Sequence, residues 1–544
     1  MTTKKILRVG LLTVAFALPL VSFLCEVAFG TYPCDASIFR FVGRCVAEGG
    51  VAYVDAWDNK GPMLFLPQAV GYWLLPRWGN LGPEFVCLLI SLATVALFHR
   101  LARRLEMSAW GAAVATCVFS FASWSLAHVF FANNQEAIAA LFIVSGALCG
   151  LGAATRLRLA GLGAMVGCAF LVKPNLVAFG GAFVVAWGIE AIRTREGRAL
   201  ARRLAWPFAG FVGVLGAVTG LFALKGAAYE MWDATLLFGL FEYAKSDVPY
   251  FTWWAQALRT HGMGTIWGAN LYLWIAAVVG GVVGNIGGLT DCRIDRLTDC
   301  RVDGLPLSGQ SVYQSVSQSV NQSIGQSVNQ SVSQSISQSV NFLLVWLILE
   351  FLMLFSVTSF YPHYLIVSWL PLALGVGGLF ESTERTWTVR GAKLAVVVAL
   401  AMAVVMAVRF VRGDCQRMRA ANEGKAELVE WIGRAISKGA RVAAEGSFEV
   451  IEILDAANLR VGTRYFNAEM NAKFAGEERR AWIGREVEKA RREAKWLLAP
   501  VGREVEKGVG MELEKRWKKR KEGAGVVVWE RKGEGEWGID RLGD

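Results

Sequence analysis

Four charged residues with the chemistry for proton transfer and phosphate binding lie in one segment, Cys34 to Pro62, directly after the first apolar run. They are Asp35, Asp55, Asp58 and Lys60. Unpaired charge beside a membrane is costly and is usually kept for function. A carboxylate can accept a proton from a hydroxyl group, and a lysine can stabilise a departing phosphate. The segment therefore has the residue types for acid–base chemistry beside a phosphate.

A short helix is expected to begin at Asp35, which is placed to cap its first turn. One face of this helix is apolar and another is charged: Ile38, Val42, Cys45 and Val46 against Arg40, Arg44 and Glu48. Gly49 and Gly50 end the helix. The pattern alone favours an amphipathic surface helix with a solvated charged face, in which Asp35 is no more than the cap.

The composition is that of a polytopic membrane protein. The chain has 544 residues, 54% of them hydrophobic, and a mean hydropathy of +0.40, which is too apolar for a soluble protein. Apolar runs of about 20 residues, enough to cross about 30 Å of hydrocarbon, recur from Ile6 to nearly Phe410. The first run has no convincing small-residue cleavage site, so we expect a retained helix and not a cleaved signal peptide.

The net charge of +11 does not indicate a nucleic-acid partner, because the basic residues cluster between apolar runs, as orientation signals do. The ten cysteines form no CxxC pair and indicate neither a zinc site nor a disulfide framework. Cys34 and Cys45 would lie about 16 Å apart along a helix, too far for a disulfide. No Walker loop, dinucleotide-binding glycine motif or HExxH is present, which disfavours a nucleotide-sugar donor.

About eleven crossings are expected, and Lys and Arg clusters orient them with the N-terminus in the cytoplasm and the Asp35 segment outside. The expected crossings are Ile6 to Phe29, Phe85 to Phe98, Trp110 to Phe131, Ala137 to Leu151, Leu159 to Val172, Leu176 to Ile192, Leu204 to Leu224, Ile266 to Ile286, Phe342 to Phe360, Leu365 to Phe380 and Leu394 to Val408. Met63 to Pro76 is apolar but short for a span, and we expect it against the outer leaflet.

Four parts are expected along the chain. They are an N-terminal membrane domain (1–286) with an outer loop at 30–82, a low-complexity cytoplasmic insertion (287–341), C-terminal transmembrane helices (342–411) and a soluble outer-face α/β tail (412–544). The insertion contains Gln-Ser-Val/Ile every four residues, a period that packs poorly as a helix, so disorder is expected. A dispensable expansion is favoured over a binding tract.

The tail is expected to alternate helices and short strands. The predicted helices are Ala420 to Lys438 and Glu477 to Ala494, and the predicted strands are Val442 to Ala444, Trp496 to Leu498 and Val526 to Trp529. Roughly the last fifty residues are so charged that partial disorder is expected there.

The motif from Tyr53 to Pro62, Tyr-x-Asp-x-Trp-Asp-x-Lys-x-Pro, and the Asp at the head of a juxtamembrane helix resemble the first outer loop of GT-C membrane glycosyltransferases. They are most similar to the protein-mannosyltransferase-like and aminoarabinose-transferase-like branch. The resemblance implies an all-α polytopic membrane fold, a polyprenyl-phosphate-linked sugar as donor and a catalytic loop Asp, which Asp35 matches. It covers the layout of roughly residues 1–410, whereas its specific motifs are confined to this loop and three outer helix ends.

The resemblance also implies that Asp55, Asp58 and Lys60 bind substrate, with Lys60 as the partner of the donor phosphate. The simpler interpretation of Asp58 and Lys60 is an interfacial salt bridge. Many relatives carry an Arg shortly after the apolar stretch that follows the Lys-Pro element, where this sequence has Glu84.

Three outer helix ends complete the expected site. Glu136 matches an acidic residue that faces the family's pocket, although a carboxylate there also suits the positive end of a helix dipole. Lys173, before Pro174, resembles a family Lys at a helix break. His363 resembles a family His-Tyr element, although a lone His at an interface is more often structural.

These observations together predict an inner-membrane glycosyltransferase that moves a sugar, with inversion, from a polyprenyl phosphate to an acceptor on the outer, periplasmic face. Lipid, glycan and protein acceptors all stay open. No cofactor is expected, and the need for a divalent cation stays open. The alternative is a transporter or flippase of a lipid-linked sugar, which would place charges near mid-membrane on broken helices, and an inactive paralogue is a third reading.

Overall fold

The computed structural model describes most of the membrane part and most of the tail. The described residues are 3–30, 34–124, 135–151, 155–195, 197–243, 345–350, 369–380, 422–437, 440–444, 447–464, 477–500, 517–523 and 526–532. Residue 342 and isolated positions between 390 and 420 are also described. The Gln-Ser tract and His363 lie outside them.

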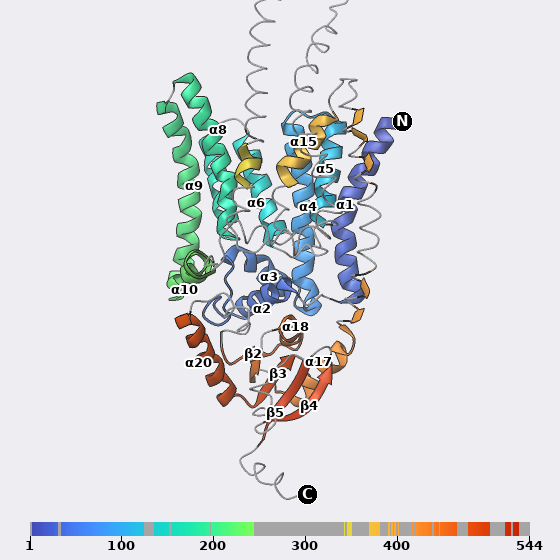
Figure 1. The fold of residues 1–544 in the computed structure, drawn as a ribbon, viewed down its shortest axis with the longest axis vertical. Helices are drawn as coiled ribbons and strands as arrows, with labels where there is room; N and C mark the ends of the chain where they lie inside the picture. The colour runs from blue at the N-terminus through green and yellow to red at the C-terminus, as the bar shows by residue number, and fades with distance from the viewer. Residues whose placement is uncertain are drawn as a thin grey trace, which may run out of the picture.

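The membrane part is a bundle of helices (Figure 1). They are α1 (Thr3–Phe29), α4 (Leu81–Arg104), α5 (Ala109–Trp124), α6 (Gln135–Gly150), α7 (Arg156–Phe170), α8 (Ala178–Thr194), α9 (Gly197–Ala223) and α15 (Trp369–Leu379). A 3-10 turn, η2 (Pro174–Val177), joins α7 to α8, and Lys173 lies just before it. The bundle therefore has a helix at each expected crossing that falls on described residues. The exceptions are Phe342 to Phe360 and Leu394 to Val408, of which only short fragments are described.

Four stretches in the described part are long and apolar enough to cross a membrane: Lys5–Phe29, Leu81–Arg104, Pro174–Thr194 and Gly197–Ala223. Shorter apolar helices occur at Ala109–Ser123, Gln135–Gly150 and Trp369–Leu379. The expected crossing from Ile266 to Ile286 lies outside the described residues. The number of about eleven therefore remains a prediction, whereas the polytopic helical architecture is observed.

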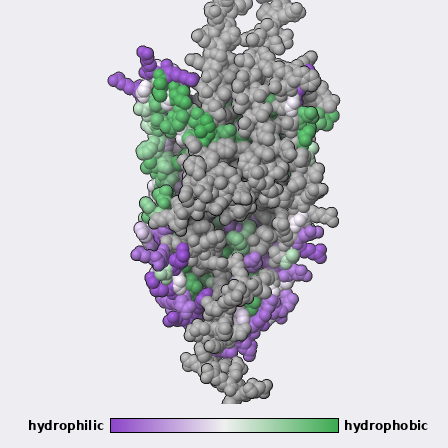
Figure 2. Space-filling view, in the orientation of Figure 1, coloured by the Kyte–Doolittle hydropathy of each residue, from purple (hydrophilic) through white to green (hydrophobic). Residues whose placement is uncertain are grey.

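The sides of the bundle are apolar and its ends are polar. Figure 2 shows apolar surface along α8 and α9, with hydrophilic residues above it and over the tail below. On α9, Phe208, Leu221 and Leu224 are 68%, 64% and 84% exposed. Apolar side chains that face outward over a whole helix are expected where lipid replaces water.

Two short helices, α2 (Asp35–Ala47) and α3 (Pro62–Leu74), lie between the bundle and the tail (Figure 1). Pro62 occupies the first turn of α3, where its missing N–H leaves no helical hydrogen bond unmade. A 3-10 turn, η1 (Pro76–Trp78), then leads into α4. The short helix agrees with the prediction that Met63 to Pro76 does not span the membrane.

The tail contains a five-stranded mixed sheet in the order β2-β1-β3-β5-β4. Its strands are β1 (Arg441–Ala444), β2 (Arg460–Val461), β3 (Trp496–Pro500), β4 (Trp517–Gly523) and β5 (Val526–Arg531). β1 pairs in parallel with β2 and β3, and β5 pairs antiparallel to β3 and β4. In the described part of the tail, three helices accompany the sheet: α17 (Lys425–Ala435), α18 (Phe448–Ala456) and α20 (Glu477–Glu493).

The sequence prediction missed three elements of the tail: the short strand β2, the strand β4 and the helix α18. β4, with the sequence WKKRKEG, lies where partial disorder was expected, and it pairs with β5 along its length. Its lysines are mostly exposed at the sheet edge, where charge prevents further pairing. α18 was also not predicted, because its buried face includes two acidic residues, Glu452 and Asp455, that disguise its amphipathic pattern.

A second segment of the membrane part reaches the tail. The expected outer loop after α9 begins with α10 (Ala228–Trp232) and two π-helical turns, η3 (Asp233–Leu237) and η4 (Gly239–Tyr243). Arg479 of α20 pairs with Asp233 at 2.6 Å and with Glu242 at 3.0 Å. The tail is therefore held at both α2 and α10–η4.

The N-terminal end of α1 lies at one end of the bundle, and α2, α3 and the tail lie at the other (Figure 1). The turn between α8 and α9 lies at the N-terminal end. Reporter fusions after Arg203 and after Gly533 should therefore give opposite signals in a topology assay, because one site lies near each end. Equal signals from the two fusions would contradict this arrangement.

Candidate active site

The loop from Val51 to Gly61 folds around a buried tyrosine. Tyr53 has a φ of 72°, an unusual conformation for a bulky residue that needs support from its surroundings. Its N–H donates to Ala56 O at 2.8 Å, and its hydroxyl donates to Lys60 O at 2.7 Å. Thr235 donates to the same hydroxyl at 3.5 Å. Tyr53 thus connects the start of the loop to its end at Lys60.

The end of the loop is docked on the C-terminal end of α7. Gly61 N–H donates to Val172 O at 3.2 Å, and Met63 N–H donates to Leu171 O at 3.1 Å. The approach is so close that a Cβ on Gly61 would lie 1.8 Å from Leu171 O. Only glycine fits there. This contact brings Lys60 to the helix break that carries Lys173.

Lys173 and Glu136 form an ion pair at this helix break. Lys173 Nζ lies 2.9 Å from Glu136 Oε1, and the two side chains are 13% and 1% exposed. Burial lowers the pKa of Lys173, while the charge of Glu136 and its hydrogen bond act in the opposite direction. The charges of Lys60 and Asp35 also act on the pKa of Lys173. Four of the predicted site residues therefore share one electrostatic environment.

Asp58 belongs to the same cluster. Its side chain is buried, and among the described residues its Oδ2 atom has no hydrogen-bond partner. Burial raises the pKa of Asp58, the charge of Lys60 opposes this, and the charge of Asp35 adds to it. Lys60 Nζ donates to Asn59 Oδ1 at 2.7 Å. A buried carboxylate oxygen that lacks a donor is suited to accept one from a ligand.

Asp35 lies at the start of α2, as expected, but it is not the cap. Cys34 is the N-cap residue, and its N–H donates to Ser37 Oγ at 3.3 Å. Asp35 occupies the first helical position and is partly exposed. The prediction that Asp35 caps the helix is therefore wrong, and in the described part of the chain its carboxylate takes part in no hydrogen bond. The negative charge of Asp35 acts to raise the pKa of Asp58 and that of Lys173.

Of the predicted site residues that the structure describes, Asp55 lies apart from this cluster. Asp55 Oδ2 accepts the Val51 N–H at 2.7 Å, and the side chain lines a separate cavity between the loop and the tail. His363 lies outside the described residues, so its place stays a prediction. The described part also contains no group of three or more His, Cys, Asp and Glu arranged to hold a metal.

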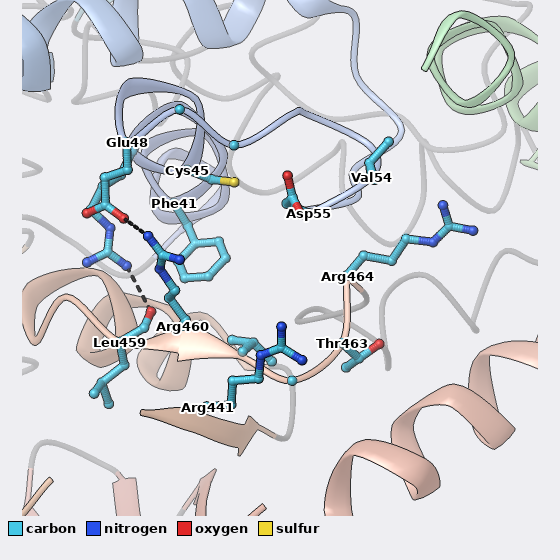
Figure 3. Close-up of a pocket in the computed structure, with 15 residues that line it drawn as sticks. Phe41, Cys45, Glu48, Val54, Asp55, Arg441, Leu459, Arg460, Thr463 and Arg464 are labelled. Carbon is cyan, nitrogen blue, oxygen red and sulfur yellow. Dashed lines mark hydrogen bonds and ion pairs between the residues drawn. The ribbon is translucent and has the colours of Figure 1, made fainter. Parts of the chain in front are cut away.

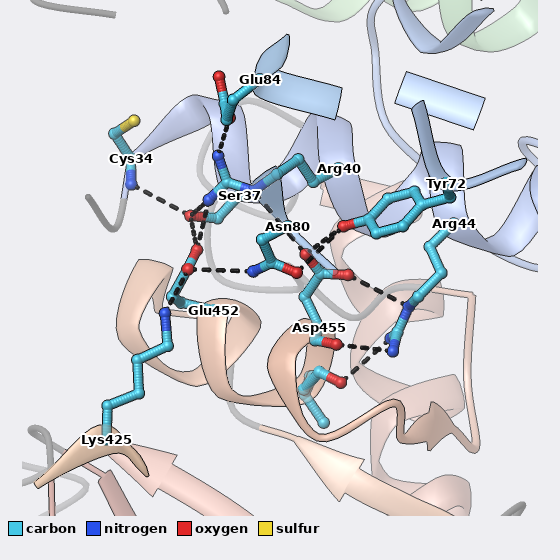
Figure 4. Close-up of polar contacts among 11 residues, drawn as sticks. Cys34, Ser37, Arg40, Arg44, Tyr72, Asn80, Glu84, Lys425, Glu452 and Asp455 are labelled. Carbon is cyan, nitrogen blue, oxygen red and sulfur yellow. Dashed lines mark hydrogen bonds and ion pairs between the residues drawn. The ribbon is translucent and has the colours of Figure 1, made fainter. Parts of the chain in front are cut away.

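The charged face of α2 is buried, which corrects the expectation of a solvated face. Figure 4 shows Arg40 and Arg44 among acidic residues of α4 and α18. Arg40 is 1% exposed; it pairs with Glu84 of α4 and lies 2.5 Å from Glu452 of α18. Arg44 lies 3.1 Å from Asp455. The face is charged because it contacts a second charged element, not because it meets water.

Further polar groups complete this ion cluster. Tyr72 donates to Asp455 at 2.7 Å, and Asn80 donates to Glu452 at 3.2 Å. Lys425 lies 2.6 Å from Glu452. Burial raises the pKa of Asp455, and the charges of Arg44 and Arg40 oppose that rise. The acceptors of the cluster are therefore supplied by both the membrane part and the tail.

The ion cluster also gives Glu84 a place. Glu84 departs from the Arg that the family resemblance leads one to expect in this region. In the structure Glu84 is 2% exposed and pairs with Arg40. Glu84 is thus a structural anchor of α2 in this chain. The only sequence signal for it was the departure from the family pattern.

Cys34 and Cys45 are both free, which confirms that they do not form a disulfide.

No protein-family model and no curated protein sequence matches the chain. Among solved structures, ArnT from Cupriavidus metallidurans bound to undecaprenyl phosphate matches with a TM-score of 0.59 and 14% identity, over 96% of this chain and 98% of that one. ArnT in the apo state matches with a TM-score of 0.57, 14% identity and the same coverage. AglB, an archaeal oligosaccharyltransferase from Archaeoglobus fulgidus, matches at 0.46 and 13%, over 96% of this chain and 74% of that one.

The ArnT matches cover nearly the whole of both chains, so they define the fold of the membrane part and of the tail together. The fold is that of the GT-C membrane proteins, and the resemblance drawn from the loop motif is confirmed at this level. Because the identity is only 14%, the match assigns no role to any residue of this chain. The geometry described above is the basis for those roles.

The contact of Gly61 with Leu171 should be indispensable to the site. Gly61→Ala is expected to displace the loop, because its Cβ cannot occupy the space of Leu171 O, and to expose Trp57, which is 2% exposed in the structure. Limited proteolysis of the purified protein should then cut the loop faster than in the wild type. Gly188→Ala in α8 is the control, because a Cβ there meets nothing within 4 Å and the backbone is helical. Equal cutting of Gly61→Ala and wild type would show that the loop is not docked there.

Arg40 should be the residue on which the ion cluster depends most. Arg40→Met keeps the length of the side chain but leaves Glu84 and Glu452 buried without their shared cation. Loss of one partner from a buried ion pair destabilises by about 3 to 5 kcal/mol. The thermal unfolding temperature in detergent should fall well below that of Arg434→Gln, which removes an arginine that is 70% exposed. Similar unfolding temperatures for the two variants would contradict the structural role.

Proposed function

We propose that the chain is an integral membrane glycosyltransferase of the GT-C type. It transfers a sugar, with inversion, from a polyprenyl-phosphate-linked donor to an acceptor on the outer face of the inner membrane. The observation that carries the proposal is the cluster of Asp35, Asp58, Lys60, Glu136 and Lys173 at the end of the bundle that faces the tail. The cluster contains acids and cations together, as transfer from a phosphate to a hydroxyl requires.

In this proposal Asp35 accepts the proton of the acceptor hydroxyl as the hydroxyl oxygen attacks the sugar carbon. The bond between that carbon and the phosphate oxygen breaks, and the departing phosphate gains negative charge. Lys60 and Lys173 would stabilise this charge. Glu136 would hold Lys173 in place through the 2.9 Å ion pair. A single displacement of this kind inverts the sugar carbon.

The likeness of fold supports the class of donor. ArnT is an aminoarabinose transferase, and one of its matching structures contains undecaprenyl phosphate. We therefore infer a polyprenyl phosphate as the carrier. The sugar and the acceptor follow from neither the fold nor the cluster, and lipid, glycan and protein acceptors are all compatible. The proposal includes no cofactor and leaves the use of a divalent cation to assay.

We also propose the division of the chain into a membrane domain (1–286), an insertion (287–341), C-terminal transmembrane helices (342–411) and an outer-face tail (412–544). The presence of α2, α3 and the tail at one end of the bundle, opposite the start of α1, supports a single active side (Figure 1). With the N-terminal lysines in the cytoplasm, that side is the periplasmic one. His363 remains a proposed substrate contact, whereas Asp55, proposed from the sequence as another, lines the separate cavity beside the tail.

One observation favours the alternative of a lipid-linked sugar transporter. Glu350 is 4% exposed in an apolar helical segment, where it accepts a hydrogen bond from Trp346 at 3.1 Å. Buried acids within membrane helices are common on transport pathways. The test separates the two functions. Purified protein in vesicles receives radiolabelled polyprenyl-phosphate sugars and a mixture of envelope acceptors, and covalent label on an acceptor supports transfer. Movement of the intact lipid between leaflets without such label would overturn the proposal.

Asp35→Asn tests the proposed base directly. The substitution keeps the size of the side chain and, because the Asp35 carboxylate is not the helix cap, should leave α2 intact. Asparagine cannot accept the proton, and general-base catalysis contributes about 10² to 10⁴ in rate. We expect normal expression and donor binding, with transfer at least about a hundredfold slower.

The matched control is Glu430→Gln, which removes a carboxylate that is 70% exposed on α17, and its transfer rate should equal that of the wild type. Transfer by Asp35→Asn within a few fold of wild type would instead direct the search for the base to Asp58, the buried acid of the same cluster.

A further inference from the structure

A cavity of about 390 Å³ separates the outer loop from the tail (Figure 3). One wall is the end of α2 and the turn after it, with Glu48, Gly50 and Asp55. The other wall comes from the start of β1, from β2 and from the turn that follows, with Arg441 and Arg460. The volume lies in the range of about 300 to 1,000 Å³ that is usual for small-molecule sites.

The two walls carry opposite charge. The tail wall has Arg441, Arg460 and Arg464, and the loop wall has Glu48 and Asp55. Arg44 of α2 also lines the cavity, but its charge is paired with that of Asp455. Figure 3 shows Arg441 and Arg460 extending from the tail toward the loop. The walls do not neutralise each other tightly, because Arg460 and Glu48 are 3.9 Å apart and 64% and 34% exposed. Such exposed pairs contribute little, so a ligand can compete for the arginine.

Arg441 is the guanidinium best placed to receive a ligand. In the described part of the chain it makes no hydrogen bond or ion pair, although it lines the cavity. Arg464, in contrast, is held in place. Its guanidinium donates to Tyr53 O at 3.3 Å, and its own carbonyl accepts the Trp57 N–H at 2.9 Å. The cavity thus combines two cations that a ligand can reach, Arg441 and Arg460, with a rigid edge at Arg464.

The carboxylates of the loop wall, Glu48 and Asp55, disfavour a ligand that has anionic groups and no hydrogen-bond donors. One carboxylate oxygen of Asp55 accepts the Val51 N–H at 2.7 Å, and the Asp55 side chain lines the cavity. Carboxylates repel a phosphate group but accept hydrogen bonds from hydroxyl groups. Guanidinium groups bind phosphate and carboxylate through paired hydrogen bonds. A complementary ligand therefore has an anionic group at one end and hydroxyl groups at the other.

We propose that this cavity binds an anionic glycan, a sugar ring that carries a phosphate or carboxylate group, at a site separate from the cluster around Lys173. The sugar hydroxyls contact Asp55 and Glu48, and the anionic group contacts Arg441 and Arg460. The site stands on its own geometry and does not depend on transfer activity.

The test is titration calorimetry on the full-length protein in detergent, with glucose 6-phosphate as probe. Glucose, inorganic phosphate and vesicles that contain phosphatidylglycerol are titrated separately. Saturable binding of glucose 6-phosphate, tighter than that of glucose or phosphate, is expected. Arg441→Gln should weaken it by about tenfold or more, since one charge-assisted hydrogen-bond pair is lost. Arg460→Gln serves as a second variant at an exposed position.

Asp55→Asn separates the two ends of the ligand. Asparagine still accepts the Val51 N–H, so the turn is kept, but the loop wall loses a charge. The preference for glucose 6-phosphate over inorganic phosphate should then shrink. Arg434→Gln, an exposed arginine of α17 outside the cavity, should bind the probe as the wild type does.

Three results would overturn the proposal. They are phosphate that binds as tightly as glucose 6-phosphate, binding of the vesicles alone, and unchanged affinity in both Arg441→Gln and Arg460→Gln. Because no donor lipid is present, these results would leave the proposed transfer reaction untouched, and loss of transfer in its own assay would leave the glycan site untouched.

Discussion

The arrangement of this protein depends on one buried guanidinium group. Arg40 is 1% exposed, and an arginine keeps its proton in any protein environment, so the fold must supply carboxylates around it. It takes them from two directions: Glu84 belongs to α4 of the membrane bundle, and Glu452 belongs to α18 of the tail. Helix α2 is therefore fixed to both at once. Since removal of either acid leaves a buried charge with less compensation, the bundle, the loop helix and the tail form one structural unit.

With α2 fixed, the loop has little freedom left. The Tyr53 hydroxyl donates to Lys60 O, and Gly61 contacts the end of α7. The backbone from Tyr53 to Gly61 is therefore held at both ends. Burial raises the pKa of Asp58 and lowers that of Lys173. Both shifts move the pKa of the group toward neutral pH. This direction suits a site where protons are transferred beside a phosphate. A rigid loop would hold these groups in place without reorganisation when charge develops.

Local patterns predicted much of this structure, because helix and strand periods need only neighbouring residues. The short helix after Cys34, the short α3 and most of the tail strands are of this kind. Long-range pairing could not be predicted in the same way. Arg40 and Glu452 are 412 residues apart, and a charged helix face looks the same in sequence whether it meets water or another charged helix. Asp55 and Asp58 show the limit at short range: they are close neighbours in the loop, yet Asp55 lines the cavity beside the tail and Asp58 is buried where the charge of Lys60 acts on it.

The loop separates two environments that the tail helps to build. On one side Asp58 lies in the cluster with Lys60 and Lys173, and on the other side Asp55 faces the arginine-lined cavity. Arg464 joins the two, because its guanidinium bonds to the Tyr53 carbonyl and its own carbonyl bonds to the Trp57 N–H. A close-packed loop cannot shift one of its faces without shifting the other. The tail therefore holds the backbone of the loop that carries Asp58 through these two hydrogen bonds, and does not merely cover it.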